Sequence, residues 1–185
     1  YQPSIPMNRF LKHKAFLAFE RKNSSFTLKD RFHNQDERDL APFYLVWDNL
    51  KDPEVKAEGA AGWPWALVKV DLIEFSQKFP LLAPLKNSKP NVSNGFVLFR
   101  AKCLSCHSIN GEGGTKGVEL NSPHSVTEYI KPKFLRQWIL DPSSVRTNAA
   151  MPKFNQDSKN WSTELDDIIE YLKAMAKSRP VATKK

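Results

Sequence analysis

The stretch Ala101–His107 constrains this chain more than any other part of its sequence, because it ends in C-x-x-C-H. Two thiols three positions apart can each bond one vinyl group of a haem, and the histidine after them can place its imidazole on the iron. Cys103 and Cys106 are the only 2 cysteines of the 185-residue chain. The motif therefore predicts one covalent haem held by Cys103, Cys106 and His107.

Two other kinds of site share part of this pattern. Zinc needs about four ligands, usually from two such cysteine pairs, whereas the remaining histidines, His13, His33 and His124, are scattered along the chain. A thioredoxin-like dithiol expects a βαβ context and needs no histidine in this place. The sequence favours haem, with a zinc or dithiol binding protein as the non-haem alternative.

Charge and hydropathy narrow the choice of partners. The formal net charge is +8 at pH 7, which favours acidic protein partners or anionic surfaces, although a generally solvated basic surface has the same composition. The lysines are spread out rather than clustered, so no nucleic-acid partner is expected. The longest apolar runs, such as 43–47 and 63–68, are far shorter than the roughly 20 residues of a spanning helix. We therefore expect membrane association only through a partner.

Prolines divide the chain. Pro80 and Pro84 come before the polar stretch 86–91, and Pro90 lies within it. This composition is typical of linkers. We expect a smaller β-containing N-terminal module with its linker at residues 1–90, and a second domain at residues 91–185.

The first module is predicted to consist of short strands and polar loops. The runs 15–19 and 41–47 are short and rich in apolar, aromatic or β-branched residues, which favours strands. Residues 68–75 alternate between apolar and polar side chains, as in a half-buried strand. The polar stretches 29–39 and 51–62 are expected to be surface loops.

The second domain is predicted to be helical. A first helix, capped by Asn91 or Ser93, carries Phe99 four residues before Cys103. The 4 glycines of the following loop, residues 110–120, permit a backbone pressed closely against a flat ring, although a plain flexible loop has the same composition.

Two more helices are expected downstream. Pro132 suits the first turn of a helix that stops at Asp141-Pro142. The last helix is expected to open at Ser162, followed by four apolar residues at the spacing of one buried face: Leu165, Ile168, Ile169 and Leu172. The expected fold class is therefore α+β, with an all-α domain after the β-containing module.

Residues 92–177 resemble the class I c-type cytochromes, which carry a single haem. In that family, a glycine and an aromatic residue of the first helix pack against an aromatic residue of the last helix. Gly95, Phe99 and Tyr171 match these positions, with Ile168 beside them. The resemblance implies an all-α cytochrome c domain with one covalent haem c.

The resemblance also implies a distal axial ligand. The family places a methionine followed by proline on a loop before the final helix, and Met151-Pro152 matches in order and place. His107 and Met151 are therefore the expected metal ligands. The competitors are Met175 on the last helix, Met7 in the other module and His124, which would generally give a lower potential than methionine.

One position departs from the family pattern. The family commonly has Gly-Pro-x-Leu after the haem loop, where the proline carbonyl accepts the proton on the histidine's other nitrogen. This chain has Gly117-Val118-Glu119-Leu120. A backbone carbonyl is still present at Val118, so we expect the hydrogen bond to be retained without the rigidity of a proline.

Parts of the first module are similar to the end of the molybdopterin-binding domain of sulfite-oxidase-like enzymes, as found fused to c-type cytochromes. The matching residues are Leu17-Ala18-Phe19-Glu20, Pro42–Trp47 and Trp63-Pro64-Trp65. Those enzymes hold molybdenum with a cysteine, whereas both cysteines here are used by haem, so no molybdenum chemistry is expected. We expect a docking or structural module, with simple packing against the haem domain as the alternative.

These features predict electron transfer rather than catalysis. An iron ligated by both His107 and Met151 has no open position for a substrate, which suits outer-sphere transfer of single electrons. We expect a carrier, or the electron-transfer subunit of a larger oxidoreductase complex. The alternative is a haem enzyme or gas-binding sensor from which Met151 dissociates.

Partner and location follow from the same chemistry. Basic residues near the haem edge could steer an acidic redox partner: Lys102, Lys116, Lys133 and Lys153. Haem of this type is attached outside the cytoplasm, so we expect an exported, periplasmic protein. The sequence opens at Tyr1 without an apolar leader, as if processed or trimmed.

Overall fold

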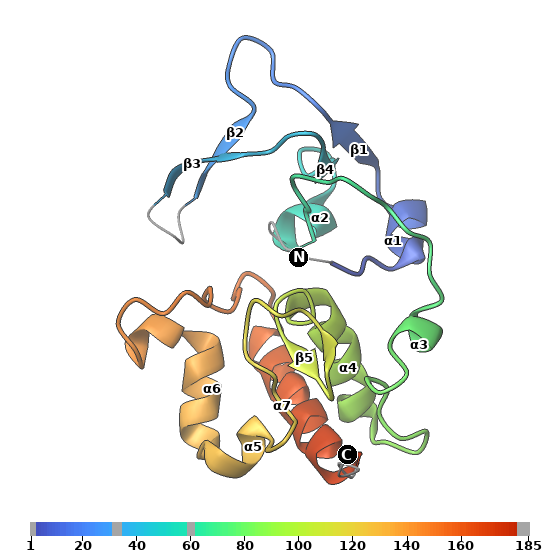
Figure 1. Ribbon diagram of the computed structural model, residues 1–185, viewed down its shortest axis with the longest axis vertical. Coiled ribbons are helices and arrows are strands. Elements are labelled where there is room, and N and C mark those ends of the chain that lie inside the picture. Colours follow the sequence, from blue (N-terminus) through green and yellow to red (C-terminus); the bar gives the residue numbers. More distant parts are fainter. Residues whose placement is uncertain (1–2, 31–34, 59–61, 181–185) are drawn as a thin grey trace. The chain divides into compact units, whose positions relative to one another are not determined.

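The structure is a computed structural model that describes residues 3–30, 35–58 and 62–180. These residues form two compact units, Ile5–Leu72 and a C-terminal unit from Ile73 onward that also includes residues 3–4. Helices occur together with small antiparallel sheets (Figure 1), which confirms the α+β class at that level. Within the described part of the chain, no helix has the length and apolarity that crossing a bilayer requires.

The N-terminal unit holds two separate two-stranded antiparallel sheets. β1 (Ala15–Ala18) pairs with β4 (Tyr44–Trp47), and β2 (Thr27–Asp30) pairs with β3 (Gln35–Asp39). The short helices α1 (Met7–Lys12) and α2 (Pro53–Glu58) belong to the same unit (Figure 1). Its small core contains Leu45, Trp47 and Val55, with Ile5, Ala15 and Trp63 packed against them.

β1 and β4 confirm the strands predicted at 15–19 and 41–47, but both loop predictions for this unit are wrong. Residues of the polar stretch 29–39 belong to β2 and β3. These two strands pair as an antiparallel ribbon through their backbones. The stretch 51–62 contains α2, because Asp52 Oδ1 accepts hydrogen bonds from the N–H groups of Glu54 (3.0 Å) and Val55 (3.2 Å) and so caps a helix.

The strand predicted at residues 68–75 is also absent. Lys69 Nζ and Asp71 Oδ1 form an ion pair of 2.9 Å on one side of the extended chain, while Val68 and Leu72 are each 84% exposed. A strand needs a neighbour to complete its ladder, and no backbone hydrogen bond of residues 68–73 occurs among the described residues. The chain then enters the short helix α3 (Phe75–Lys78).

The C-terminal unit is mainly helical. Its two longest helices, α4 (Pro90–Lys102) and α7 (Trp161–Lys177), pack against each other. The shorter elements are α5 (Val126–Tyr129), α6 (Pro132–Leu140), the 3-10 helix η1 (Pro142–Ser144) and a hairpin of β5 (Ser108–Ile109) with β6 (Glu112–Gly113) (Figure 1). One buried core joins α4, α5, α6 and α7.

The helix predictions hold with small shifts at the ends. α6 begins at Pro132 and stops before Asp141, as expected. α4 begins at Pro90, so neither Asn91 nor Ser93 caps it: proline suits the first helical position because its missing N–H needs no partner there. α7 begins one residue before Ser162, and its predicted apolar face is buried: Leu165, Ile168, Ile169 and Leu172.

The proline-rich segment before α4 packs on the C-terminal unit. Leu82 is fully buried in that unit's core, and its carbonyl oxygen accepts a 2.8 Å hydrogen bond from the Tyr171 hydroxyl. The two units therefore divide at residues 72–73, ahead of the linker that the prolines suggest.

α4 and α7 approach each other closely at Gly95. A Cβ at this position would lie 2.0 Å from the Asp167 carbonyl oxygen and 2.9 Å from Tyr171 Cβ. One turn further along α4, the buried Phe99 ring lies 5.3 Å from the Tyr171 ring, centroid to centroid. The packing expected for Gly95, Phe99 and Tyr171 is confirmed.

Substituting Gly95→Ala should therefore destabilise the domain, even though alanine is the better helix former by about 1 kcal/mol. The added methyl group must push the α7 backbone away, and overpacking of this kind typically costs about 1–3 kcal/mol. Denaturant unfolding followed by circular dichroism measures the change. Val97→Ala, on the exposed side of α4, is the control and should change the free energy of unfolding by less than about 0.5 kcal/mol. Equal stabilities for Gly95→Ala and the parent protein would contradict the close contact.

Candidate haem site

The C-x-x-C-H motif lies in the turn that ends α4. The N–H of Cys103 donates to the Phe99 carbonyl at 2.9 Å, and the N–H groups of Cys106 and His107 both donate to the Cys103 carbonyl, at 3.0 and 2.9 Å. Neither thiol is in a disulfide. The end of the helix thus presents two unbridged thiols and an imidazole within a single turn.

The imidazole of His107 is held on two sides. Its Nδ1 lies 2.8 Å from the carbonyl oxygen of Val118, and since a carbonyl can only accept, Nδ1 carries the proton and Nε2 is left with a free lone pair. A Cβ on Gly117 would lie 2.5–2.9 Å from three atoms of the ring, so only glycine fits beside it. The hydrogen bond expected at Val118 is confirmed.

Two other glycines bring the following loop against the motif itself. A Cβ on Gly113 would lie 2.4 Å from the His107 carbonyl oxygen, and one on Gly114 would lie 2.2 Å from that of Ser105. The N–H of Gly114 donates to the Leu104 carbonyl at 2.9 Å. The loop is therefore packed on the backbone of the motif. The close approach of this loop to the haem ring stays a prediction.

The environment of Cys103 differs from that of the reactive thiol in a redox dithiol. Burial raises the pKa of the Cys103 thiol to about 12, an effect that Lys102 partly opposes and Cys106 reinforces. Dithiol oxidoreductases depend on a thiol whose pKa is lowered. Zinc lacks a donor set as well: across the described ranges, no group of three His, Cys, Asp or Glu side chains is arranged so that it could hold a metal ion. Paired thiols with an adjacent free imidazole nitrogen fit covalent haem better than either alternative.

Met151 lies in the non-helical segment between η1 and α7, where it packs partly buried against the core. Its competitors are placed differently. Met175 is 2% exposed within the core on α7, and Met7 is 58% exposed in α1 of the other unit. His124 lies exposed on a bend.

The two remaining histidines, His13 and His33, lie far from the motif in sequence. Nδ1 of His13 lies 2.5 Å from Asp52 Oδ2 within the N-terminal unit, and His33 falls outside the described residues.

Two of the four lysines expected around the site form ion pairs with carboxylates. Lys102 pairs with Glu164 at 3.0 Å, and Lys153 pairs with Asp141 at 2.7 Å. Lys116 and Lys133 are exposed. The charge available for steering a partner is therefore smaller than a count of lysines suggests.

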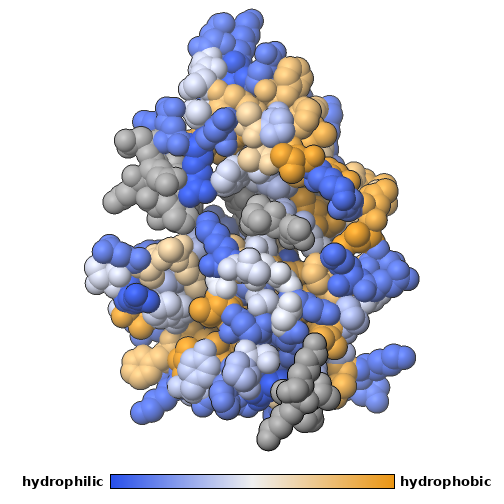
Figure 2. All heavy atoms as spheres, viewed as in Figure 1, coloured by the Kyte–Doolittle hydropathy of each residue, from blue (hydrophilic) through white to orange (hydrophobic). Residues whose placement is uncertain are grey.

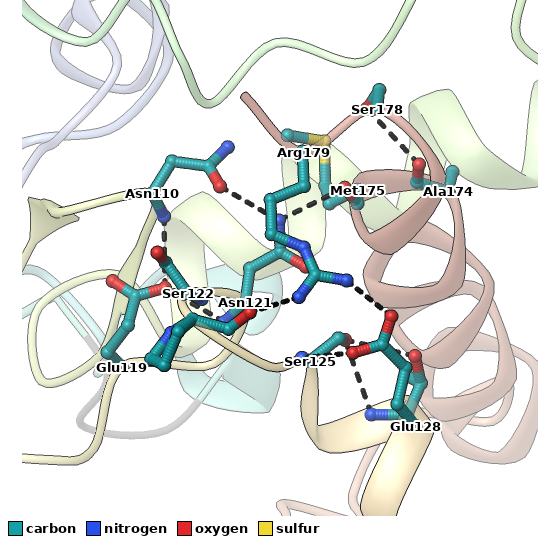
Figure 3. Close-up of polar contacts among 12 residues, drawn as sticks. Asn110, Glu119, Asn121, Ser122, Ser125, Glu128, Ala174, Met175, Ser178 and Arg179 are labelled. Atoms are coloured by element: carbon teal, nitrogen blue, oxygen red, sulfur yellow. Dashed lines mark hydrogen bonds and ion pairs between the residues drawn. The ribbon is translucent and has the colours of Figure 1, made fainter. Parts of the chain in front are cut away.

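Glu119 is a residue of this site that the motif alone does not indicate. Its Oε1 accepts hydrogen bonds from the N–H groups of Asn110 (2.9 Å), Asn121 (2.8 Å) and Ser122 (3.1 Å), and its Oε2 accepts one from Gly111 (3.0 Å) (Figure 3). In the sequence, the only sign of this network is that Glu119 follows the Asn110-Gly111 turn by eight residues.

The electrostatics of Glu119 follow from these bonds. Burial acts to raise the pKa of its carboxyl, but the donated hydrogen bonds outweigh burial and leave the pKa below its ordinary value of 4.5. A carboxyl whose pKa is lower in the folded state contributes stability above its unfolded pKa. That contribution is lost as the pH falls from about 4.5 through the folded pKa.

Residues 92–176 match the family model of cytochrome c. This part of the chain is similar to cytochrome c domains. The family binds covalently attached haem c, typically one per single-haem domain.

Among curated proteins, a nitric oxide reductase subunit from Stutzerimonas stutzeri is 34% identical over 79 residues, which make up 40% of this chain and 51% of the relative. The chain thus spans about half the length of that relative. No solved structure matches.

Taken together, these matches support an electron-transfer haem protein. They also agree with the structure, because the cytochrome c domain lies within the unit that contains the motif, the glycine contact and the His107 hydrogen bond.

Gly117→Ala is expected to displace the His107 ring, because the new methyl group has no room beside it. The variant should lose stability by about 1–3 kcal/mol and show an altered visible spectrum after haem attachment. Gly111→Asn is the control, because Gly111 has a φ of +80° with no atom within 4 Å of a Cβ, and asparagine tolerates that backbone conformation. Identical spectra for Gly117→Ala and the parent would show that the ring is not confined as described.

Proposed function

We propose that this chain is a single-haem c-type cytochrome that transfers electrons without catalysing a reaction itself. Cys103 and Cys106 bond the haem, while His107 and Met151 are the two axial ligands. When bound, haem c supplies an iron that exchanges single electrons between its ferrous and ferric states. The observation that carries the proposal is the imidazole of His107, with Nδ1 committed to the Val118 carbonyl and Nε2 left for a metal.

The environment of Met151 supports its role. It is followed by Pro152, lies outside any helix and is only partly buried, so its thioether is able to turn toward a haem iron. Met175, by contrast, is enclosed in the core. Ligation by Met151 opposite His107 leaves no open position, which excludes substrate from the metal and favours a higher potential than two histidines give.

A partner is required, because a carrier must receive and deliver each electron. The matched relative is a subunit of nitric oxide reductase, which supports a role as a subunit of a larger oxidoreductase. We further propose that this chain is its electron-transfer subunit in the periplasm, because haem of this type is attached outside the cytoplasm. The net charge of +8 and the exposed Lys116 and Lys133 favour a partner with an acidic docking face.

We assign the N-terminal module a docking role toward the larger subunit of such a complex. Apolar side chains gather on the surface of this unit in the face drawn in Figure 2, and several exceed 45% exposure: Phe16, Leu17, Phe19, Val68, Val70 and Leu72. Exposed apolar groups of this kind commonly mark protein contacts. The resemblance of this module to a molybdopterin-binding domain stays a prediction.

Carbon monoxide binding tests the coordination. The reduced protein at neutral pH should keep its visible spectrum under carbon monoxide, because both axial positions are filled. Met151→Ala should open one position and bind the gas, whereas the control Met175→Leu, a change of similar volume in the core, should not. Gas binding by the parent protein would instead indicate an enzyme or sensor with a labile ligand. An unchanged Met151→Ala would point to another ligand, with His124 the first to examine.

A further inference from the structure

The hydrogen bond from His107 depends on where one exposed loop residue lies. Val118 is 63% exposed, and valine does not restrict its own backbone as proline does. Something else must hold its carbonyl 2.8 Å from the imidazole.

The backbone on either side of Val118 is anchored. The N–H of Gly117 donates to the Cys106 carbonyl at 2.7 Å, and the N–H of Leu120 donates to the Ser108 carbonyl at 2.9 Å. Between these two bonds, the side chain of Glu119 gathers four N–H groups from two separate segments, 110–111 and 121–122.

The network continues beyond Glu119 into the core. Asn121 is 1% exposed, and its Nδ2 donates to Asn110 Oδ1 at 2.8 Å and to the Met175 carbonyl at 3.0 Å (Figure 3). Asn110 in turn donates from its own Nδ2 to the Leu81 carbonyl at 3.1 Å. The loop that carries Val118 is thereby fixed to α7 and to the segment before α4.

We propose that Glu119 is a positioning residue for the axial imidazole: its carboxylate clamps the 110–122 loop and so holds the Val118 carbonyl against the Nδ1–H of His107. This inference rests on the proposed function, since it concerns the same ligand. Glu119 supplies through hydrogen bonds the rigidity that the Val118 backbone lacks.

The clamp has an electronic consequence. A strong acceptor on Nδ1–H makes a ligating imidazole more electron-rich, which stabilises the ferric state. If the carbonyl drifts, the bond weakens and the reduction potential rises. Glu119 would therefore tune the potential without touching the haem.

The test compares Glu119→Gln with Glu128→Gln in the haem-loaded protein. Glu128 is a matched control because it also accepts a backbone hydrogen bond, from the Ser125 N–H at 2.8 Å, and forms an ion pair with Arg179. None of its hydrogen bonds within the described residues involves the segments 110–111 and 121–122 that Glu119 holds. Both variants should lower the melting temperature.

Only Glu119→Gln should raise the reduction potential. It should also speed exchange of the His107 Nδ1 proton, followed by NMR, by about tenfold, the factor that corresponds to losing one hydrogen bond of this kind. Adding Val118→Pro to Glu119→Gln should restore both values, because proline fixes the backbone. The Val118 N–H it removes makes no hydrogen bond within the described part of the chain. If Glu119→Gln does not fold, Glu119→Asp allows the same comparison.

The results distinguish a failure of the proposed function from a failure of the role assigned to Glu119. A parent protein without haem, or one in which His107→Ala leaves the spectrum unchanged, refutes the proposed function. A parent protein with His107 on the iron, but with equal potentials and exchange rates for the two glutamine variants, refutes only the role of Glu119.

Discussion

The hydrogen bond between His107 Nδ1 and the Val118 carbonyl is the contact on which the site depends. It sets which imidazole nitrogen is free, and it joins the end of α4 to a loop with no regular structure beyond the hairpin of β5 and β6, two residues each. Gly117 makes the approach possible because a side chain there would overlap the ring. The bond itself contributes little to stability, on the order of 1 kcal/mol. Its importance lies in fixing the direction of a ligand.

The rest of the cytochrome c domain holds the two ends of that bond in place. On one side, Gly95 lets α4 lie against α7, and the buried ring of Phe99 meets Tyr171, so the helix that delivers the cysteines is fixed. On the other side, Glu119 and Asn121 fasten the loop to the turn at Asn110 and to α7. A rigid helix crossing and a hydrogen-bonded loop therefore meet at one histidine.

Sequence reasoning succeeded where a residue restricts structure locally. The glycine at a helix crossing and the proline at the start of α6 each do so, and Val118 needed only its carbonyl. The attachment of haem at C-x-x-C-H stays a prediction. The network of Glu119 could not be predicted, because its partners are backbone N–H groups that any sequence supplies. The alternation of apolar and polar residues at 68–75 led to a wrong strand prediction, because a strand also needs a neighbouring strand to pair with. The start of α2 could have been found, since Asp52-Pro53 is a typical helix-opening pair.

We expect this polypeptide to carry one covalently bound haem on Cys103 and Cys106. The decisive measurement is mass spectrometry under denaturing conditions, on protein exported by a host that matures c-type cytochromes. We predict the mass of the chain plus one haem, returning to that of the bare polypeptide when both cysteines are replaced by alanine. A parent protein that has the bare mass under these conditions would contradict the account.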